Sequence, residues 1–335
     1  MRMTGVNVVL EKKSKSENYY SFLLVVIIKL SSLTLSSQQN NSNKVLQDLN
    51  EGGNMIKRIV ILCISISVLG ILHAQYNPDN NVVTISKLYL NDVRDVEDGS
   101  YEERKEVLEE YTKKMNPLQD KLISSMHLGH FWSGATDEVT ILNEWASIAD
   151  ADATIIATGE TRKKAWRKDE DREEFMAKYN KYFVGKHSDV AILELNTDRL
   201  KRSSRKHKDD TFVTVVEYTL VPISDVENGS AEEREELMQT HFDNIVKKDD
   251  TIISYMQLQH YWSGSSGGPE GFPIIVVTEY ASIEEALNED NSALWEAAWP
   301  DEEERKAFGA KLFPYWGFGK HKDIGLHNNW VNLSK

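Results

Sequence analysis

Apolar and polar residues alternate in a similar order in two long stretches of the chain. VVTISKLYL (82–90) and FVTVVEYTLV (212–221) are rich in β-branched and aromatic residues, which is typical of strands. An Asp-Gly or Asn-Gly turn follows each run, and then comes Ser-x-x-Glu, beginning at Ser100 or Ser230. This is a capping box, in which the Ser and Glu side chains bind free backbone N–H groups of a starting helix. We therefore predict a strand and then a long helix in both stretches.

Both stretches continue with two strands, a helical region and a last strand. The predicted elements are 126–133, 139–146, 168–182 and 189–195 in the first stretch, and 256–263, 274–281, 301–313 and 323–330 in the second. The first helix is expected to run toward Ser125 or Tyr255, with a kink or restart at Pro117. Ser147 and Ser282 each open a further helical segment. The resulting order is β-α-β-β-α-β, the split βαβ pattern of a ferredoxin-like sheet.

The two stretches are copies of one unit. RDVEDGSYEER (94–104) matches SDVENGSAEER (224–234), and GHFWSG (129–134) matches QHYWSG (259–264). NEWASI with TEYASI, AWRKDEDREEF with AWPDEEERKAF, and GKHSD with GKHKD follow in the same order. Matches in constant order over this length indicate a tandem duplication.

Each unit would form a four-stranded sheet with helices on one face. The other face would be apolar, and two such faces can bury each other. We therefore predict an α+β protein in which two tandem ferredoxin-like units, 80–197 and 211–335, pack sheet to sheet as a pseudo-dimeric α/β barrel, which leaves room for a further homodimer. Residues 198–210 are polar and basic, and they are predicted to be an exposed linker.

This duplicated element order resembles the dimeric α/β-barrel superfamily, whose members pack two such sheets into one barrel as a homodimer or a fused tandem. The resemblance covers residues 80–335 and rests on element order and duplication. Members include small monooxygenases, haem-dependent enzymes and stress-induced proteins, so the resemblance does not choose an activity. The haem-dependent members commonly present a proximal histidine from a helix. The recurrent histidines here are expected on a strand and in a loop, which does not favour haem.

The N-terminal residues predict export. Residues 55–74 have a basic start, a short apolar run and a small residue, Ala74, which is the anatomy of a secretory signal peptide. We expect cleavage after Ala74, a secreted or periplasmic bacterial protein, and no membrane span in the mature chain. Glu51-Gly52-Gly53 can be encoded by a purine-rich ribosome-binding sequence just before the Met55 codon. We therefore interpret residues 1–54 as a mistranslated leader.

Composition narrows the partners and the chemistry. The formal net charge is −14, and without residues 1–74, which hold eight Lys or Arg and four Asp or Glu, it is −18. An acidic surface repels phosphate backbones, so no nucleic-acid partner is expected. Cys63 is the single cysteine and lies in the predicted signal peptide. Disulfides, thiolate metal sites and cysteine nucleophiles are therefore excluded from the predicted mature chain.

The repeated motif supplies the first candidate catalytic residues. If it is a strand, Met126, Leu128, His130 and Trp132 share one face, and so do their counterparts Met256, Leu258, His260 and Trp262. Glu144 and Glu279 lie among apolar residues of the next strands, where a carboxylate needs a partner. A His130–Glu144 pair and a His260–Glu279 pair could each act as a general base. The alternative is a structural hydrogen bond that specifies strand register.

Other recurrent residues are candidates for ligand binding. His187 and His321 lie in the two Gly-Lys-His-x-Asp stretches, and either of them with His130 and Glu144 would complete a two-His, one-carboxylate set for Zn or Fe. No close ligand spacing supports a metal, and the stretch equally suits a turn in which Asp caps the backbone. Trp132, Trp262 and Tyr261 are candidates to line a pocket for a small apolar or aromatic ligand. Large aromatic residues also serve in core packing.

Two functions follow from these residues. The first is a secreted small-molecule-binding protein or cofactor-independent enzyme with its pocket at the barrel. The second is a non-catalytic envelope or extracellular interaction module, in which the repeated motif only holds the two sheets together. The sequence contains no nucleophile elbow, dinucleotide fingerprint or metal-spaced cluster that would name a substrate or a cofactor.

Overall fold

The structure is a computed structural model that describes residues 80–204, 207–265, 267, 271–288, 290–317 and 320–335. They belong to one compact unit, Leu72–Lys335. The predicted leader (1–54) and signal peptide (55–74) lie outside the described residues.

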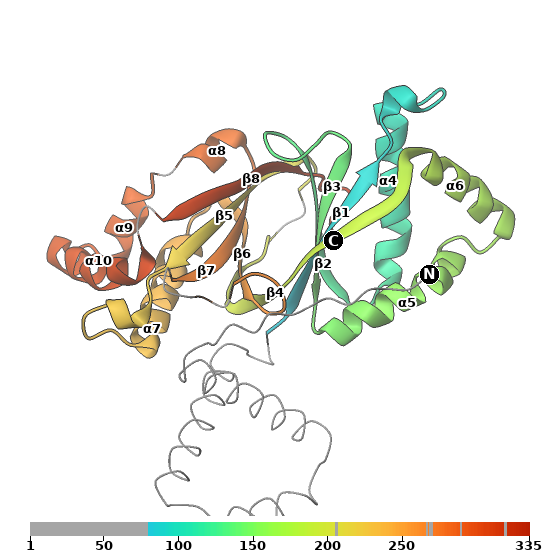
Figure 1. The fold of residues 1–335 in the computed structure, drawn as a ribbon. Coiled ribbons are helices and arrows are strands. Elements are labelled where there is room, and N and C mark those ends of the chain that lie inside the picture. Colours follow the sequence, from blue (N-terminus) through green and yellow to red (C-terminus); the bar gives the residue numbers. More distant parts are fainter. Residues whose placement is uncertain (1–79, 205–206, 266, 268–270, 289, 318–319) are drawn as a thin grey trace, which may run out of the picture. The chain divides into compact units, whose positions relative to one another are not determined.

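The described residues form a mixed helix and sheet protein around a closed barrel of eight antiparallel strands (Figure 1). The strand order is β1-β3-β2-β8-β5-β7-β6-β4. The strands are β1 (Val82–Leu90), β2 (Leu122–His130), β3 (Glu138–Trp145), β4 (Phe183–Lys201), β5 (Thr211–Leu220), β6 (Ile252–His260), β7 (Phe272–Tyr280) and β8 (His321–Asn329). The first half of the protein, β1 to β4, and the second half, β5 to β8, each contribute four neighbouring strands. The seams between the halves are the β2–β8 and β4–β6 pairs.

Helices lie outside the barrel on both sides (Figure 1). The first half has α4 (Tyr101–Met115), α5 (Ile148–Ala165), α6 (Asp169–Tyr182) and the short 3-10 helices Val93–Asp95 and Asn116–Leu118. The second half has α7 (Ala231–His241), α8 (Ile283–Leu287), α9 (Ser292–Ala298), α10 (Glu302–Trp316), the 3-10 helix Ile223–Asp225 and the π-helix Phe242–Val246. One apolar cluster packs α4 and α6 on the sheet, and a second packs α7 and α10. Within the described residues, no helix is long and apolar enough to cross a bilayer.

A third apolar cluster fills the interior of the barrel. Strands β1 to β7 all contribute to it through inward side chains such as Val83, Leu128, Leu142, Leu195, Val213, Leu258 and Val277. Successive side chains on a strand alternate between the two faces. Glu144 is therefore on the barrel side, two residues after Leu142, and Glu279 is on the barrel side, two residues after Val277.

The predicted capping boxes are confirmed in their serine half. Ser100 Oγ accepts from the Glu103 N–H, and Ser230 Oγ accepts from the Glu233 N–H, both at 3.0 Å. The glutamates do not bind the cap directly. The Ser230 N–H donates to the Tyr315 hydroxyl (3.0 Å), which donates to Glu233 Oε2 (2.5 Å). Tyr182 makes the same bridge in the first half. A tyrosine from the last helix of each half thus ties it to the first helix.

The repeated-motif strands begin and end earlier than predicted. β2 ends at His130 and β6 at His260, so Trp132 and Trp262 lie in the turns that follow. The predicted shared strand face for histidine and tryptophan is therefore wrong. In the first half, α4 stops at Met115 and Pro117 sits in a short 3-10 helix, so β2 can start at Leu122. Both motif strands are 9 residues long and therefore end at the motif histidine.

Candidate functional site

The repeated His-aromatic-Trp-Ser-Gly motif forms a clasp between the two halves, at residues 130–134 and 260–264. The backbone N–H groups of Trp132 and Ser133 donate to the Leu326 carbonyl of β8 at 3.2 and 3.1 Å. The Ser133 hydroxyl accepts from the Leu326 N–H at 3.0 Å. The second clasp makes the same three bonds to Ile192 of β4, at 3.3, 3.1 and 3.0 Å. Each clasp thus holds the last strand of the other half.

The two histidines of the motif stabilise these turns. His130 Nδ1 lies 2.8 Å from the Gly134 carbonyl oxygen, and His260 Nδ1 lies 3.0 Å from the Ser263 carbonyl oxygen. A carbonyl only accepts, so these bonds place the imidazole proton on Nδ1. Gly134 and Gly264 have φ of 79° and 85°, which favours glycine. The duplication of the motif therefore has a structural explanation.

The aromatic residues of the clasp have two different environments. Phe131 packs edge-on against Phe212 of the other half, with ring centroids 5.1 Å apart, and Tyr261 packs beside a first-half cluster that includes Val82. Trp132 and Trp262 are 81% exposed. Tyr261 therefore joins the two halves, and the two tryptophans lie on the surface rather than in a pocket.

The predicted His–Glu pairs are absent because their members lie at opposite ends of the barrel. Glu144 is opposite Ser124 on β2, and His130 is six residues farther along that strand. At about 3.3 Å per residue, the separation along the strand is about 20 Å. The second half repeats this arrangement, since Glu279 is opposite Ser254 on β6 and that strand ends at His260.

Glu144 is bound to a cation from the predicted linker. Its side chain is 1% exposed, and it accepts two hydrogen bonds from Arg202, at 2.8 and 2.6 Å. Ser124 Oγ and Asn81 Nδ2 donate to the same carboxylate, each at 2.6 Å. Burial alone would raise the pKa of Glu144, but together the bonds from Arg202, Ser124 and Asn81 lower it below its ordinary value. This carboxylate is therefore charged, paired and closed off.

Glu279 has the equivalent position but different partners. It is 6% exposed, and it accepts from Thr211 Oγ1 and Ser254 Oγ at 2.6 Å and from Asn329 Nδ2 at 2.9 Å. Thr211 and Ser254 match Asn81 and Ser124 in the repeat. Among the described residues, however, no cationic side chain forms an ion pair with Glu279.

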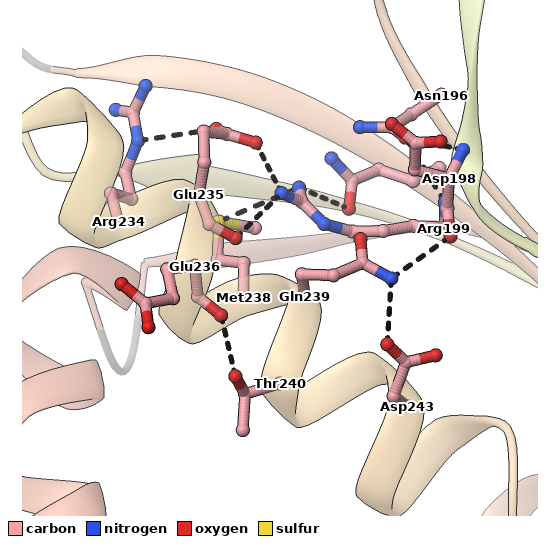
Figure 2. A network of polar contacts seen from close by, with 11 residues as sticks. Asn196, Asp198, Arg199, Arg234, Glu235, Glu236, Met238, Gln239, Thr240 and Asp243 are labelled. Atoms are coloured by element: carbon pink, nitrogen blue, oxygen red, sulfur yellow. Dashed lines mark hydrogen bonds and ion pairs between the residues drawn. The ribbon is translucent and has the colours of Figure 1, made fainter.

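The segment 196–202, here called the strap, joins the two halves. Arg199 is buried and donates to the Glu235 carboxylate of α7, to the Glu235 carbonyl at 3.3 Å and to Gln257 Oε1 of β6 at 3.4 Å (Figure 2). Lys201 Nζ donates to the Asp249 and Val246 carbonyls at 2.5 and 3.4 Å. Together with the bond from Arg202 to Glu144, these contacts show that the prediction of an exposed linker is wrong for the strap.

A cavity of about 880 Å³ lies at the end of the barrel that carries the strap. Glu279, Ser254, Ser124 and Asn329 line it with polar side chains. Its apolar lining includes Ile123, Met126, Pro117, Leu200, Met256 and Val331, and its charged or titratable lining also includes Lys113, Lys201, Arg202, His207 and Lys335. A volume of this size is typical of sites for drug-sized molecules.

The remaining predicted ligands do not gather at this cavity. The side chains of His187 and His321 are 66% and 48% exposed, and each lies near an aspartate two residues along its own strand. The predicted two-His, one-carboxylate set is therefore not assembled. In the part of the chain that the structure describes, no three His, Cys, Asp or Glu residues are arranged to hold a metal ion.

Haem-dependent members of the superfamily commonly bind haem through a histidine on a helix, and no such histidine is among the described residues that line the cavity. The one histidine among its described lining residues, His207, follows the strap rather than lying on a helix.

The site residues missed by the sequence analysis are Arg202, Ser124, Ser254, Asn329 and Lys113. Ser124 and Ser254 occupy matching positions in the repeat, 130 residues apart, so the duplication contained a signal for them. The duplication contained no such signal for Arg202, because Arg202 lies in the connection between the two copies.

Comparisons with known proteins do not identify a family. No protein-family model matches the sequence, and no curated protein matches it. Similar solved structures include a provisionally assigned monooxygenase from Fusobacterium nucleatum (8% identity, 75% of this chain and 91% of that one, TM-score 0.41). A mutant chlorite dismutase from Candidatus Nitrospira defluvii (10%, 77% and 94%, TM-score 0.40) and an anthrone oxidase-like protein (12%, 76% and 92%, TM-score 0.34) are also similar. At these values the likeness carries no inference about ligand or activity.

Proposed function

We propose that this protein binds a small organic molecule in the cavity at the strap end of the barrel. The observation that carries the proposal is the cavity itself, which is about 880 Å³ and is lined by both halves of the chain. Buried Glu279 and Arg202, which its ion pair with Glu144 holds in place, give it fixed polar groups beside an apolar surface, the usual composition of a ligand site.

The wider setting is part of the same proposal. The strand orders β4-β1-β3-β2 and β8-β5-β7-β6 support two fused ferredoxin-like units and membership of the dimeric α/β-barrel superfamily. The domain limits 80–197 and 211–335, cleavage after Ala74 and export from the cell are supported by the sequence pattern alone.

A blocked cavity mouth tests the proposed function. A diverse fragment library is screened against the protein by ligand-observed NMR, and the hits are rescreened against Lys113→Trp and Lys105→Trp. Both lysines are exposed on α4, but of the two only Lys113 lines the cavity. We expect hits that are lost with Lys113→Trp and kept with Lys105→Trp. A library without hits, or hits indifferent to both changes, would contradict a ligand site in this cavity.

A second function, as an interaction module, is favoured by one observation. Trp132 and Trp262 are 81% exposed, and both lie in clasps at the other end of the barrel. Exposed aromatic residues are enriched at protein interfaces. If they join two copies of this chain, sedimentation velocity should show concentration-dependent dimers that disappear when both are changed to alanine.

A further inference from the structure

The two halves show what the carboxylate at the end of each barrel sheet can bind. In the first half, the chain itself supplies a cation, since Arg202 donates to both oxygens of Glu144 at 2.8 and 2.6 Å. In the second half, Glu279 lines the cavity with matching hydroxyl donors and forms no ion pair among the described residues. A buried carboxylate is stabilised by a cation, so the cavity offers a place for one.

The hydrogen bonds of Glu279 specify the kind of cation. Its Oε1 accepts from both Thr211 and Asn329, whereas its Oε2 accepts from Ser254. A carboxylate oxygen has two acceptor positions, so Oε2 keeps one for a further donor. A guanidinium fork binds both oxygens together, as Arg202 does on Glu144. One remaining position on one oxygen suits a single N–H of an ammonium group instead.

The rest of the cavity carries the opposite charge. Lys113 and Arg202 line it, and two of the five N–H groups of Arg202 are used on Glu144. Lys201 and Lys335 also line it, but their ammonium groups donate to backbone carbonyls. A ligand with only a positive charge would be repelled by these side chains, and an anionic group would be attracted to Lys113 and Arg202.

We infer that the cavity binds an amino-acid-like zwitterion. Its ammonium group donates to Glu279 Oε2, its carboxylate lies beside Lys113 and Arg202, and its apolar body contacts Met126, Met256 or Leu200. This inference rests on the proposed function, because it names the ligand class of the same cavity.

Three matched probes separate the two charges: phenylalanine, 2-phenylethylamine, which lacks the carboxylate, and 3-phenylpropionate, which lacks the ammonium group. Each is titrated into the full chain and followed by NMR chemical shifts. We expect phenylalanine to bind about tenfold more tightly than either single-charge probe, since each charged hydrogen bond adds to binding. 3-Phenylpropionate binding as tightly as phenylalanine would overturn the inference.

Variants locate the two contacts. Glu279→Gln should weaken the binding of phenylalanine and of 2-phenylethylamine about tenfold and leave the binding of 3-phenylpropionate unchanged. Lys113→Gln should weaken the binding of phenylalanine and of 3-phenylpropionate. Glu284→Gln, at the exposed start of a helix, is the control and should not change the binding of any of the three probes. The probe series on the unchanged protein decides the question even if Glu279→Gln fails to fold. If no probe binds while library fragments do, the zwitterion is wrong and the small-molecule site stands; if nothing binds, both are wrong.

Discussion

Glu144 and Glu279 occupy equivalent positions in the two halves, yet one site is closed and the other is open. Arg202 covers Glu144, whereas Glu279 has only neutral donors among the described residues and borders the cavity. The strap is the cause, because a duplicated chain has two copies of each strand but a single connection between the copies. The same carboxylate is thus enclosed in an ion pair in one half and borders a cavity in the other, without any change in the carboxylate itself.

The largest expected effect concerns a buried histidine that only the first half has. His127 is buried and its Nδ1 has no hydrogen-bond partner, and burial lowers its pKa from 6.5 to about 4. The matching residue is Gln257. Because the unfolded chain binds a proton at higher pH than the folded chain, the histidine lowers stability as pH falls from 6.5 toward 4. The free energy of unfolding of His127→Gln should therefore fall less at acidic pH than that of the wild type, by up to about 3 kcal/mol.

Urea unfolding of the wild type and His127→Gln at pH 7.0 and 4.5 measures this effect. Similar stabilities are expected at pH 7.0, and the variant should be the more stable protein at pH 4.5. His187→Gln, at an exposed position, is the control and should follow the wild type. Parallel pH curves for wild type and His127→Gln would show that His127 is not buried in its neutral form.

The next effect tests the comparison of the carboxylates directly. Glu144→Gln removes the charge that Arg202 binds and should lower the free energy of unfolding by about 2 kcal/mol. Glu279→Gln removes no ion pair and should cost less than about 1 kcal/mol. Chemical unfolding at pH 7 measures both. Equal losses in the free energy of unfolding would mean that a cation reaches Glu279 as well. The conclusion that the two carboxylates differ would then be wrong.

The same ion pair gives a second test by pH. The bond with Arg202 lowers the pKa of Glu144, so its contribution is present above the unfolded pKa and is lost as pH falls through the lower folded value. Combining Arg202→Met with Glu144→Gln should therefore give a coupling energy at pH 7 that shrinks at acidic pH. Arg167→Met, at an exposed position, should show no coupling with Glu144→Gln.

A smaller effect is expected at the clasps, where the halves are alike. Ser133→Ala and Ser263→Ala each remove the hydroxyl that accepts a backbone N–H of the other half. Each should cost about 1 kcal/mol, and the two losses should add because the clasps lie on different seams. Unequal losses would show that one seam carries more of the barrel's stability than the other.

The smallest effect is expected for the exposed tryptophans. Trp132→Ala and Trp262→Ala remove side chains that are 81% exposed, so each should change the free energy of unfolding by less than about 0.5 kcal/mol. Differential scanning calorimetry of both variants checks this. A large loss from either would mean that its ring is buried by a contact between molecules under those conditions.

The sequence predicted strands that have a clear apolar pattern and helices that begin at a capping serine. The strands at 82–90 and 212–221 and the helix starts at Ser100, Ser147, Ser230 and Ser282 are all present. The sequence does not indicate the beginning of β2 at Leu122, because the Ile-Ser-Ser run before Met126 has no clear alternation of apolar and polar residues. The basic residues of the strap are typical of a solvated linker, and only their contacts with Glu144, Glu235 and the carbonyl groups of Val246 and Asp249 show that the strap is packed against the barrel.

The sequence by itself determined the duplicated unit, the order of its strands and helices, and the presence of a buried carboxylate and a histidine motif in each copy. Only the tertiary structure decided which residues meet. Strand register placed His130 about 20 Å from Glu144 instead of beside it. Pairing across the seams turned the histidine motif into a clasp, and the strap gave Arg202 to Glu144 and left Glu279 at the cavity. These are contacts between residues far apart in the chain, which no local pattern encodes.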